Sequence, residues 1–436
     1  MAAMAILITA LLAVCVIPLA TWVAWCRRML RRVRFAQRSE GELLGDYLRR
    51  QDLRIDWDQH DIGYLTDGIV FVIGGGGTIG GRLAQELGPA GYQRLVLVDN
   101  DENGLYRVGR TLLALGHRQD ALRLELVDVR DRVAVEHLFA VHRPTVVFHY
   151  ANYKSAALGE SSARAFVRVN VAGMSALLDV AGRTPSVETF VYLSSDKAEK
   201  ASTTYGRTKR VCELLVRAAA DVGREAGGGA DSPATPIRFA TMRYCNVLDA
   251  AGSFAIPTFR DQILAGHRIT IRRMPDGSIP DRYFVDIRTA AQAALLAGAH
   301  AGQAEVFSLN ADHIAPIGID EVALMLARAA GVRDPQGWCR RNISYVAATP
   351  GEKASELLGQ GVAVAASPLT NLLAPAAAER AAFLSSVREL LAVCEQPGNE
   401  KPARLLDSIL RAHDPAYGEI GASTPCVPEE APHAVG

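Results

Sequence analysis

The sequence predicts an α/β protein with a doubly wound parallel sheet, preceded by one membrane-spanning helix. Strand-length apolar segments alternate with helix-length segments after residue 67, and a glycine-rich turn follows the first strand. A long uncharged apolar run lies near the N-terminus. The 436 residues include 47 basic and 47 acidic side chains, so no net charge attracts nucleic acid, and we expect a small-molecule partner.

The apolar run extends from Ala5 to Cys26 and is long enough to cross a bilayer as a helix. A secretory signal peptide would carry a basic residue before its apolar run. Here the basic residues follow the run: Arg27, Arg28, Arg31, Arg32 and Arg34. The positive-inside rule therefore predicts a single-pass anchor in the inner (cytoplasmic) membrane with the later residues in the cytoplasm, and Trp22 and Trp25 suit an interfacial aromatic belt. The alternative is a buried helix of a soluble protein. We assign residues 1–34 to the anchor and its basic flank.

The flanking segments and the cysteines are less informative. Residues 35–66 are mixed and charged, and we interpret them as a tether that includes an amphipathic helix. Residues 413–436 are rich in Pro, Gly, Ala and Glu and are predicted to be a disordered tail. The seven cysteines are scattered without CxxC or zinc-like spacing, which favours a reducing compartment and indicates no metal site.

The first strand and turn read GIVFVIGGGGTIGGRL, from Gly68 to Leu83. Gly74, Gly77 and Gly80 fit the spacing GxxGxxG, in which glycines permit a tight turn and let a pyrophosphate approach a helix N-terminus. A glycine cluster alone could be an ordinary turn, but its position between a strand and a helix predicts a dinucleotide loop.

The later strands support the same interpretation. RLVLVD ends at Asp99, about twenty residues after the glycines, where a carboxylate accepts hydrogen bonds from ribose hydroxyls and favours NAD over NADP. Further strands end near Asp128 and Val129 and near Ala151. We therefore predict an NAD-binding Rossmann domain over residues 67–300. The predicted cofactor-binding residues are Gly74, Gly77, Thr78, Ile79, Gly80, Asp99, Asp128, Val129, Ala151, Tyr205 and Lys209.

The candidate chemistry lies on the next strand and helix. FVYLSSDK delivers Ser195, Asp196 and Lys197 to the carboxyl edge of the sheet, and YGRTKRVCELLV places Tyr205 and Lys209 one helical turn apart. A tyrosine is a poor base at neutral pH unless a nearby positive charge stabilises the phenolate. In this position Tyr205 could accept a proton from a sugar hydroxyl while hydride passes to NAD. The alternatives are an ordinary amphipathic helix and an Asp196–Lys197 pair that merely ends a strand.

The sequence resembles the capsular and polysaccharide-biosynthesis branch of the extended short-chain dehydrogenase/reductases, whose best-understood members are UDP-N-acetylglucosamine 4,6-dehydratases. The similarity extends from about Asp67 to Leu358. It is carried by GGGGTIGGRL, LVDNDENGLY, DVRDRVAVEHLFAVHRPTVVFH, SSDKA, YGRTKRVCELLV, RYCNVL, GSFAIPTFRDQI, DRYF and PGEKASELL.

The resemblance implies a reaction cycle in which NAD is reduced and then reoxidised. Tyr205 would act as the base for oxidation at C4, with Lys209 holding Tyr205 and the ribose. Lys197 would then remove the C5 proton, Asp196 would protonate the departing C6 hydroxyl, and hydride would return to C6.

The resemblance also implies a substrate-binding set: Lys154, Glu160, Asn246, Arg282 and Glu352. Departures from the family pattern fall in this pocket, because Ser155 replaces a histidine, Ala251 an arginine and Thr349 another arginine. Arg282 is a candidate diphosphate ligand, with a surface arginine as the alternative. We expect a smaller substrate-binding part over residues 301–400, with an insertion around 243–282, and a homo-oligomer by analogy.

Three interpretations of function remain. The first is a membrane-tethered NAD-dependent nucleotide-sugar 4,6-dehydratase that acts on a UDP-sugar in polysaccharide or glycan biosynthesis. The second is a nucleotide-sugar epimerase, which would use Tyr205 and Lys209 but would not need Asp196 and Lys197 as an acid and base. The third is a catalytically silent protein that binds NAD or a sugar nucleotide and anchors or regulates a membrane glycan assembly. The Asp196–Lys197 dipeptide favours the dehydratase.

Overall fold

The computed structural model describes residues 21–88, 91–226, 236–250, 255–348, 351–372 and 379–417. Its described residues form two compact units. The smaller unit comprises residues 21–49, 255–280 and 317–348, and the larger unit comprises the other described residues. Most of the predicted membrane-spanning run, the end of the predicted tail, and Ala251 and Thr349 lie outside the described residues.

The larger unit is built on a sheet that has nine strands within the described residues, in the order β14-β15-β11-β6-β5-β4-β1-β2-β3. The strands span Ile69–Ile73 (β1), Arg94–Asp99 (β2), Leu122–Leu126 (β3), Val146–His149 (β4), Thr189–Ser195 (β5), Arg238–Tyr244 (β6), Gln303–Leu309 (β11), Gly361–Ala363 (β14) and Leu369–Leu372 (β15). All neighbours from β11 to β3 are parallel, whereas β15 is antiparallel to β11 and to β14. The strand order reverses between β1 and β4, so ligands are expected at the carboxyl ends of these strands. The predicted Rossmann fold is confirmed.

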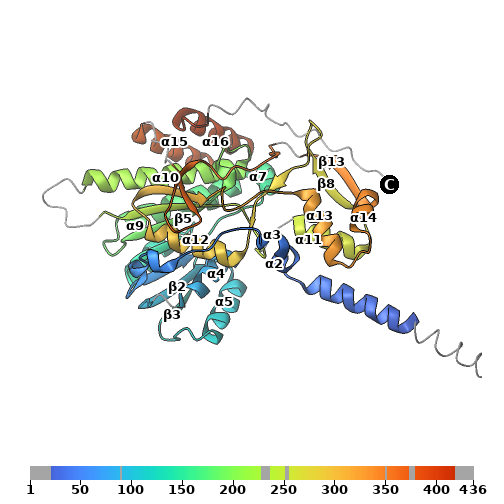
Figure 1. Ribbon diagram of the computed structural model, residues 1–436. Helices are drawn as coiled ribbons and strands as arrows, with labels where there is room; N and C mark the ends of the chain where they lie inside the picture. The colour runs from blue at the N-terminus through green and yellow to red at the C-terminus, as the bar shows by residue number, and fades with distance from the viewer. Residues whose placement is uncertain are drawn as a thin grey trace, which may run out of the picture. The chain divides into compact units, whose positions relative to one another are not determined.

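Helices cover both faces of this sheet (Figure 1). The helices span Thr78–Glu86 (α4), Glu102–Ala114 (α5), Arg132–His142 (α6), Ala156–Ser161 (α7), Gly173–Gly182 (α9), Thr204–Ala226 (α10), Ile287–Ala299 (α12), Arg380–Val393 (α15) and Glu400–His413 (α16). Phe71 and Ile73 of β1 join the apolar cluster that includes residues of α6, α9, α10, α15 and α16. Val70 and Val72 of the same strand join the cluster that includes residues of α4, α5 and α12. Because successive side chains of a strand point to opposite faces, β1 is apolar throughout.

One long apolar helix belongs to this core. Ala163–Gly182 comprises α8 (Ala163–Phe166), a π-helical segment (Val167–Ala172) and α9, and it meets the length and hydropathy expected of a membrane span among the described residues. More than half of it is buried within the larger unit. Its apolar character is therefore that of a core helix.

The chain divides differently from the predicted domain boundaries. Within residues 301–400, β11 pairs with β6 and β15 pairs with β11, so these strands extend the nucleotide-binding sheet. Helix α16 packs with α10, and α15 packs with α16, while residues 317–348 belong to the smaller unit. Strand pairing between segments so distant in sequence is decided by tertiary packing, which a local pattern does not reveal.

The predicted disordered tail begins too early. His413, Asp414 and Tyr417 are buried, and Asp414 forms an ion pair with Arg210 of α10. The polar composition of this segment did not indicate burial, because the arginine that pairs with Asp414 lies far away in the sequence.

The smaller unit contains a two-stranded parallel sheet, β8 with β13, within its described residues. Its elements are a helix over residues 21–37, Glu40–Leu43 (α2), Gly45–Leu48 (α3), Ala255–Ala265 (α11), Ile269–Arg273 (β8), Ile317–Gly318 (β12), Ile319–Ala329 (α13), Pro335–Asn342 (α14) and Ile343–Ala347 (β13). Ser39 begins α2 with a capping box, because its hydroxyl accepts from Glu42 N and Glu42 accepts from Ser39 N.

The predicted tether over residues 35–66 is folded chain rather than a free linker. Phe35, Leu44 and Tyr47 are buried in the structure, and residues 35–49 belong to the smaller unit. Residues 50–66 belong to the larger unit, where Tyr64 donates a hydrogen bond to Leu295 O at 2.8 Å. The amphipathic helix expected within this segment corresponds to α2 and α3, whose buried side chains include Leu43 and Tyr47.

Candidate functional site

The glycine loop connects β1 to α4 and closely approaches the end of β4. Gly74 has φ +87°, and a Cβ atom there would lie 2.6 Å from Ala151 N. A Cβ atom on Gly80 would collide with Gly74 O, while Gly77 immediately precedes α4. Thr78 and Ile79, with Gly80, form the first turn of α4. The structure thus builds the backbone cradle that a pyrophosphate requires at a helix N-terminus.

Asp99 ends β2 beside this loop. Its Oδ2 accepts a hydrogen bond from Gly76 N at 3.0 Å, and its Oδ1 accepts one from Asp101 N at 3.0 Å. These two backbone bonds hold the carboxylate at the carboxyl edge of the sheet, each oxygen retaining capacity for a ribose hydroxyl. The structure therefore places Asp99, Gly74 and Ala151 at the same edge.

The two predicted residues after β3 differ in character. Asp128 pairs with Arg130, and this hydrogen-bonded arginine holds the pKa of the Asp128 carboxyl below its usual value. Val129 is buried against Gly173, so its side chain belongs to the core and only its backbone can face a ligand.

Asn152 is a candidate that sequence reasoning missed. It is the third residue after β4, and its side-chain oxygen and nitrogen are both buried without a hydrogen-bond partner among the described residues. A buried amide needs partners, so a bound ligand at this edge would satisfy it. Its position after a strand that ends at the switch point was the available signal. This amide and the glycine cradle fit a dinucleotide.

Tyr205 and Lys209 lie in the first turns of α10, and both are buried. Lys209 Nζ donates to Leu193 O at 2.7 Å and lies 5.9 Å from the Tyr205 ring centroid. Burial lowers the pKa of Lys209 to about 7. Burial also raises the pKa of Tyr205 to about 12, and the positive charge that opposes this shift comes from Lys197. Lys209 was expected to supply that charge; its clear role here is to bind Leu193 O.

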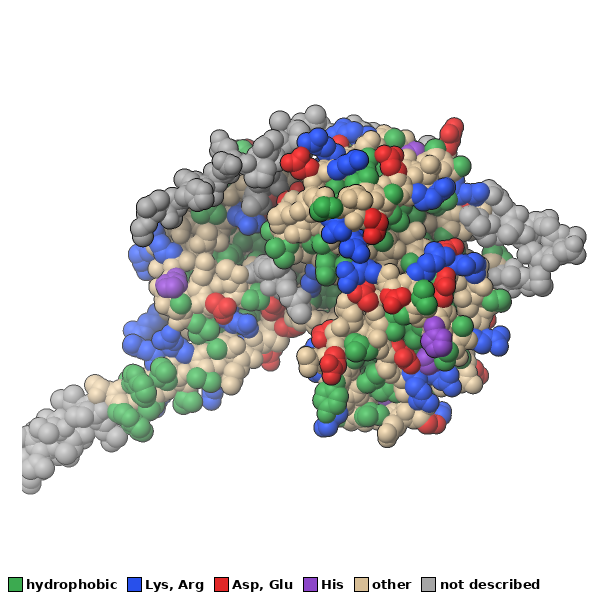
Figure 2. Space-filling view, turned by 180° about the vertical axis from the view of Figure 1, so that it is seen from behind, with side chains coloured by type: hydrophobic (Ala, Val, Ile, Leu, Met, Phe, Trp, Pro, Cys, Tyr) green, Lys and Arg blue, Asp and Glu red, His purple; other side chains and the backbone are tan. Residues whose placement is uncertain are grey.

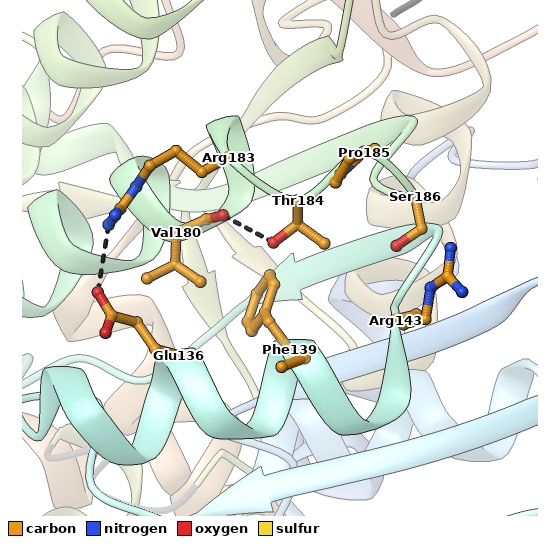
Figure 3. Close-up of a pocket in the computed structure, with 9 residues that line it drawn as sticks. Glu136, Phe139, Arg143, Val180, Arg183, Thr184, Pro185 and Ser186 are labelled. Atoms are coloured by element: carbon orange, nitrogen blue, oxygen red, sulfur yellow. Dashed lines mark hydrogen bonds and ion pairs between the residues drawn. The ribbon is translucent and has the colours of Figure 1, made fainter.

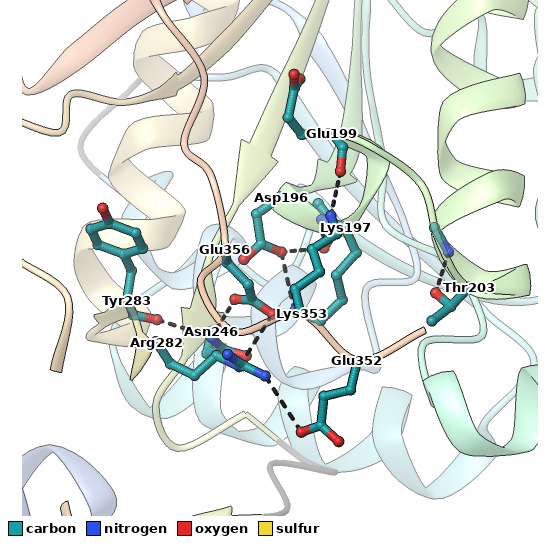
Figure 4. Close-up of polar contacts among 12 residues, drawn as sticks. Asp196, Lys197, Glu199, Thr203, Asn246, Arg282, Tyr283, Glu352, Lys353 and Glu356 are labelled. Carbon is teal, nitrogen blue, oxygen red and sulfur yellow. Dashed lines mark hydrogen bonds and ion pairs between the residues drawn. The ribbon is translucent and has the colours of Figure 1, made fainter. Parts of the chain in front are cut away.

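The acid and lysine predicted from the sequence lie in the one-turn helix that follows β5 (Figure 4). Asp196 is 1% exposed, and its Oδ1 accepts from Ser195 Oγ at 2.8 Å and from Lys197 Nζ at 3.2 Å. Burial, reinforced by Glu356, raises the pKa of Asp196 to about 7. Burial alone would lower the pKa of Lys197, but Asp196 and Glu356 outweigh it and hold the pKa above its ordinary value. Asp196 can thus be an acid near neutral pH.

Glu356 is the second residue that sequence reasoning missed. It is 5% exposed, and its Oε1 lies 2.8 Å from Lys197 Nζ. The available signal was its position four residues after Glu352 in PGEKASELL, one of the segments that carries the family resemblance.

The predicted substrate residues divide into two groups. Asn246 donates to Glu356 at 3.0 Å, and Arg282 lies 3.5 Å from both Glu352 and Glu356 (Figure 4). Asn246, Arg282 and Glu352 therefore gather around Glu356, and Arg282 is occupied by protein carboxylates where a diphosphate was expected.

The remaining two predicted substrate residues, Lys154 and Glu160, lie apart from this cluster. Glu160 accepts from Thr204 N at 2.7 Å and Thr204 Oγ1 at 3.2 Å, so it caps the helix that carries Tyr205. Lys154 is exposed between β4 and α7, where Ser155 begins α7 by accepting from Leu158 N.

A buried ionic network supports the strand and helix that carry the chemistry. Glu213 of α10 accepts from Ser194 Oγ at 2.6 Å, from Arg210 Nη1 at 3.0 Å and from Arg243 at 2.6 and 2.8 Å. Arg243 also pairs with Glu199, which follows the one-turn helix. Arg243 matches the family pattern, and in the structure it ties β6 to α10.

A pocket of about 290 Å³ lies elsewhere, between α6 and the segment that precedes β5 (Figure 3). The lining residues are Glu136, Phe139, Ala140, Arg143, Val180, Arg183, Thr184, Pro185 and Ser186. These residues lie near the amino ends of β4 and β5, opposite the edge where the glycine loop lies. The pocket contains none of the predicted site residues.

A family model described as "Polysaccharide biosynthesis protein" matches residues 70–370. A capsular polysaccharide biosynthesis protein of Staphylococcus aureus is 30% identical over 295 residues, which cover 67% of this chain and 45% of that protein. The chain thus spans about half the length of this relative, and about half that of a probable polysaccharide biosynthesis protein of Bacillus subtilis.

Solved structures share the fold. A UDP-glucose 4-epimerase of Thermus thermophilus in complex with NAD has a TM-score of 0.52 and 21% identity, covering 66% of this chain and 90% of that one. A double mutant of a dTDP-glucose 4,6-dehydratase of Streptomyces venezuelae, with NAD bound, has a TM-score of 0.53 and 18% identity, covering 66% and 87%. At these identities the likeness is one of fold.

Proposed function

Because the chain belongs to the polysaccharide biosynthesis protein family, we propose that it is an NAD-dependent nucleotide-sugar 4,6-dehydratase that acts on UDP-N-acetylglucosamine or a related UDP-sugar. The observation that carries the proposal is the buried Asp196 carboxyl, whose pKa is raised to about 7, beside Lys197 and the Tyr205–Lys209 pair. An elimination of water needs an acid for the leaving hydroxyl, whereas epimerisation at C4 does not.

NAD is the proposed cofactor. The glycine cradle of Gly74 and Gly80, the carboxylate of Asp99 and the buried amide of Asn152 would hold it. When bound, NAD accepts hydride from the sugar and its positive ring favours ionised Tyr205. Tyr205 would accept the proton of the C4 hydroxyl, and Asp196 would protonate the C6 hydroxyl. Lys209 would donate to Leu193 O and help to position the Tyr205 side chain.

A nucleotide-sugar 4-epimerase is the second candidate. It is favoured by the pairing of Lys197 with two carboxyl groups, because a lysine held as ammonium does not remove a C5 proton. The fold is shared with 4-epimerases as well as with 4,6-dehydratases, so it favours neither reaction.

A chain that begins at residue 35 should convert UDP-N-acetylglucosamine, in deuterated water, to a 4-keto-6-deoxy sugar with deuterium at C5, measured by NMR and mass spectrometry. The deuterium is expected because a proton removed from C5 exchanges with solvent before it returns. A C4 epimer without deuterium at C5 would identify the epimerase. No turnover of several UDP- and dTDP-sugars despite bound NAD would identify a silent binding protein.

We also propose that the chain is anchored by one N-terminal membrane-spanning helix, with the rest in the cytoplasm. The apolar run ends in the helix over residues 21–37, where Trp22 and Trp25 are 61% and 58% exposed. Figure 2 shows hydrophobic side chains along this helix next to the undescribed N-terminal residues. Exposed tryptophans followed by arginines suit the cytoplasmic boundary of a bilayer.

The full chain should sediment with membranes and resist extraction at alkaline pH, whereas the chain that begins at residue 35 should remain in the supernatant. This difference is expected because a span of roughly twenty apolar residues is released only by detergent. Equal recovery of both chains in the supernatant, measured by immunoblot, would contradict the anchor.

A further inference from the structure

We propose that Glu356 is a third proton-carrying residue of the site, which shares one proton with Asp196 and accepts the proton that Lys197 must lose to act as a base. The inference rests on the proposed dehydration, in which both an acid and a base are needed. It assigns a role to a residue that the sequence did not single out.

Two carboxyl groups meet at one ammonium group. Lys197 Nζ lies 3.2 Å from Asp196 Oδ1 and 2.8 Å from Glu356 Oε1, and the exposed fractions of the two acids are 1% and 5%. Away from water, the carboxylates of Asp196, Glu356 and Glu352 would outnumber the cations that they contact, Lys197 and Arg282, and would leave an excess negative charge in the cluster. Like-charged carboxyl groups in such a site retain one proton between them.

The surrounding donors decide which carboxyl group carries that proton. Glu356 receives hydrogen bonds or ion pairs from Lys197, from Asn246 Nδ2 at 3.0 Å and from Arg282 at 3.5 Å. Among the described residues, Asp196 accepts hydrogen bonds from Ser195 and Lys197, both at Oδ1, and no donor contacts its Oδ2. The negative charge is therefore better stabilised on Glu356, and the proton belongs on Asp196.

The other titratable groups facing Lys197 agree with this assignment. Tyr205 and Cys245 are buried and neutral, because burial raises the pKa of each. Lys353 also faces the cluster, but its ammonium group donates to Glu199 O. Burial opposes ionisation of Glu356, yet Lys197 and the hydrogen bond with Asp196 hold its pKa below the ordinary value.

The proposed proton transfers balance. At rest Asp196 is protonated, Lys197 is an ammonium and Glu356 is a carboxylate. A proton passes from Lys197 Nζ to Glu356 Oε1, which frees the amine. The amine then takes the C5 proton, and Asp196 gives its proton to the departing C6 hydroxyl. The C5–H and C6–O bonds break, a C5=C6 double bond forms, and water leaves. The proton that Glu356 took from Lys197 then passes to Asp196, while Lys197 keeps the C5 proton, which restores the resting protonation of all three groups.

Infrared difference spectra between about pH 5.5 and about pH 9 test the shared proton without turnover, because a protonated carboxyl group has its own carbonyl stretch. The wild-type protein should show a titrating carboxylic-acid band that D196N lacks. E356Q should also lack it, because Asp196 without a neighbouring carboxylate ionises and pairs with Lys197. E352Q is the matched control: Glu352 lies in the same segment and contacts Arg282, whereas Glu356 also contacts Lys197, so the band should remain in E352Q.

Kinetics test the proton transfer. E356Q should lower kcat on the order of 10²-fold with little change in KM, while reduction of bound NAD at C4 oxidation is still seen by absorbance. A wild-type spectrum without the band, or an E356Q variant that keeps both the band and the rate, would overturn the inference. If E356Q does not fold, D196N still decides whether Asp196 carries the proton. A wild-type protein with the band but no 4-keto-6-deoxy product would instead refute the proposed dehydration.

Discussion

Replacing Tyr205 with phenylalanine should lower kcat of the proposed reaction by roughly 10²–10⁴-fold, the contribution usual for a positioned proton acceptor. Tyr205 is buried beside Lys209 and Ser195, and in the proposed mechanism it accepts the C4 hydroxyl proton. Phenylalanine keeps the ring and its packing but removes the phenolic oxygen. The measurement is the rate of product formation at saturating substrate, with NAD affinity measured separately by calorimetry.

The matched control is Y106F, because Tyr106 lies on α5 with 64% of its surface exposed and takes no part in the site. Its rate should equal that of the wild type. A Y205F variant that retains wild-type kcat would contradict the role of Tyr205 as proton acceptor, and it would favour a base elsewhere in the site.

Replacing Glu213 with glutamine should lower the free energy of unfolding by about 3–5 kcal/mol, because it leaves buried guanidinium groups without their counter-charge. Glu213 accepts hydrogen bonds from Ser194, Arg210 and Arg243, and all four side chains are buried. The measurement is denaturant-induced unfolding of the variant and the wild type. E136Q is the control, since Glu136 pairs with Arg132 and Arg183 at the surface, where such pairs contribute about 0–1 kcal/mol.

The ionisation of Glu213 should also make the stability of the protein depend on pH. Burial alone would raise the pKa of Glu213, but Arg243 and Arg210 outweigh it and lower the pKa from 4.5 to about 2. Stabilisation by this carboxylate is therefore present above the unfolded-state value of 4.5, and it is lost as the pH falls toward 2. The difference in free energy of unfolding between the wild-type protein and E213Q should therefore shrink as the pH falls from 4.5 toward 2. A constant difference between the two across the range would contradict the assignment.

Much of the nucleotide-binding half follows from local sequence pattern. RLVLVD predicts β2 with the same bounds as the structure, and the glycines of the first turn lie where the spacing predicts. Tyr205 and Lys209 lie in one helix, and Asp196 and Lys197 follow β5, because each depends only on periodicity and on the end of a strand. These features are local, so the order of residues is enough to predict them.

The roles of several polar residues could not be predicted in this way. Arg282 was a candidate for a diphosphate, yet Glu352 and Glu356 surround it, and Glu160 caps α10 instead of lying with the other substrate candidates. Arg243 binds a buried carboxylate. Each of these contacts joins residues far apart in the chain, and a residue type alone does not say which partner it will meet.

By itself the sequence determined the parallel nucleotide-binding sheet, the position of the glycine loop and the residues at the ends of β5 and α10, because strand and helix periodicity act over a few residues. Only the tertiary structure decided that Glu356 meets Lys197, and that burial beside Glu356 raises the pKa of Asp196 to about 7. The physical reason is that burial and charge pairing depend on which distant segments fold together, and these two effects set the protonation of the site.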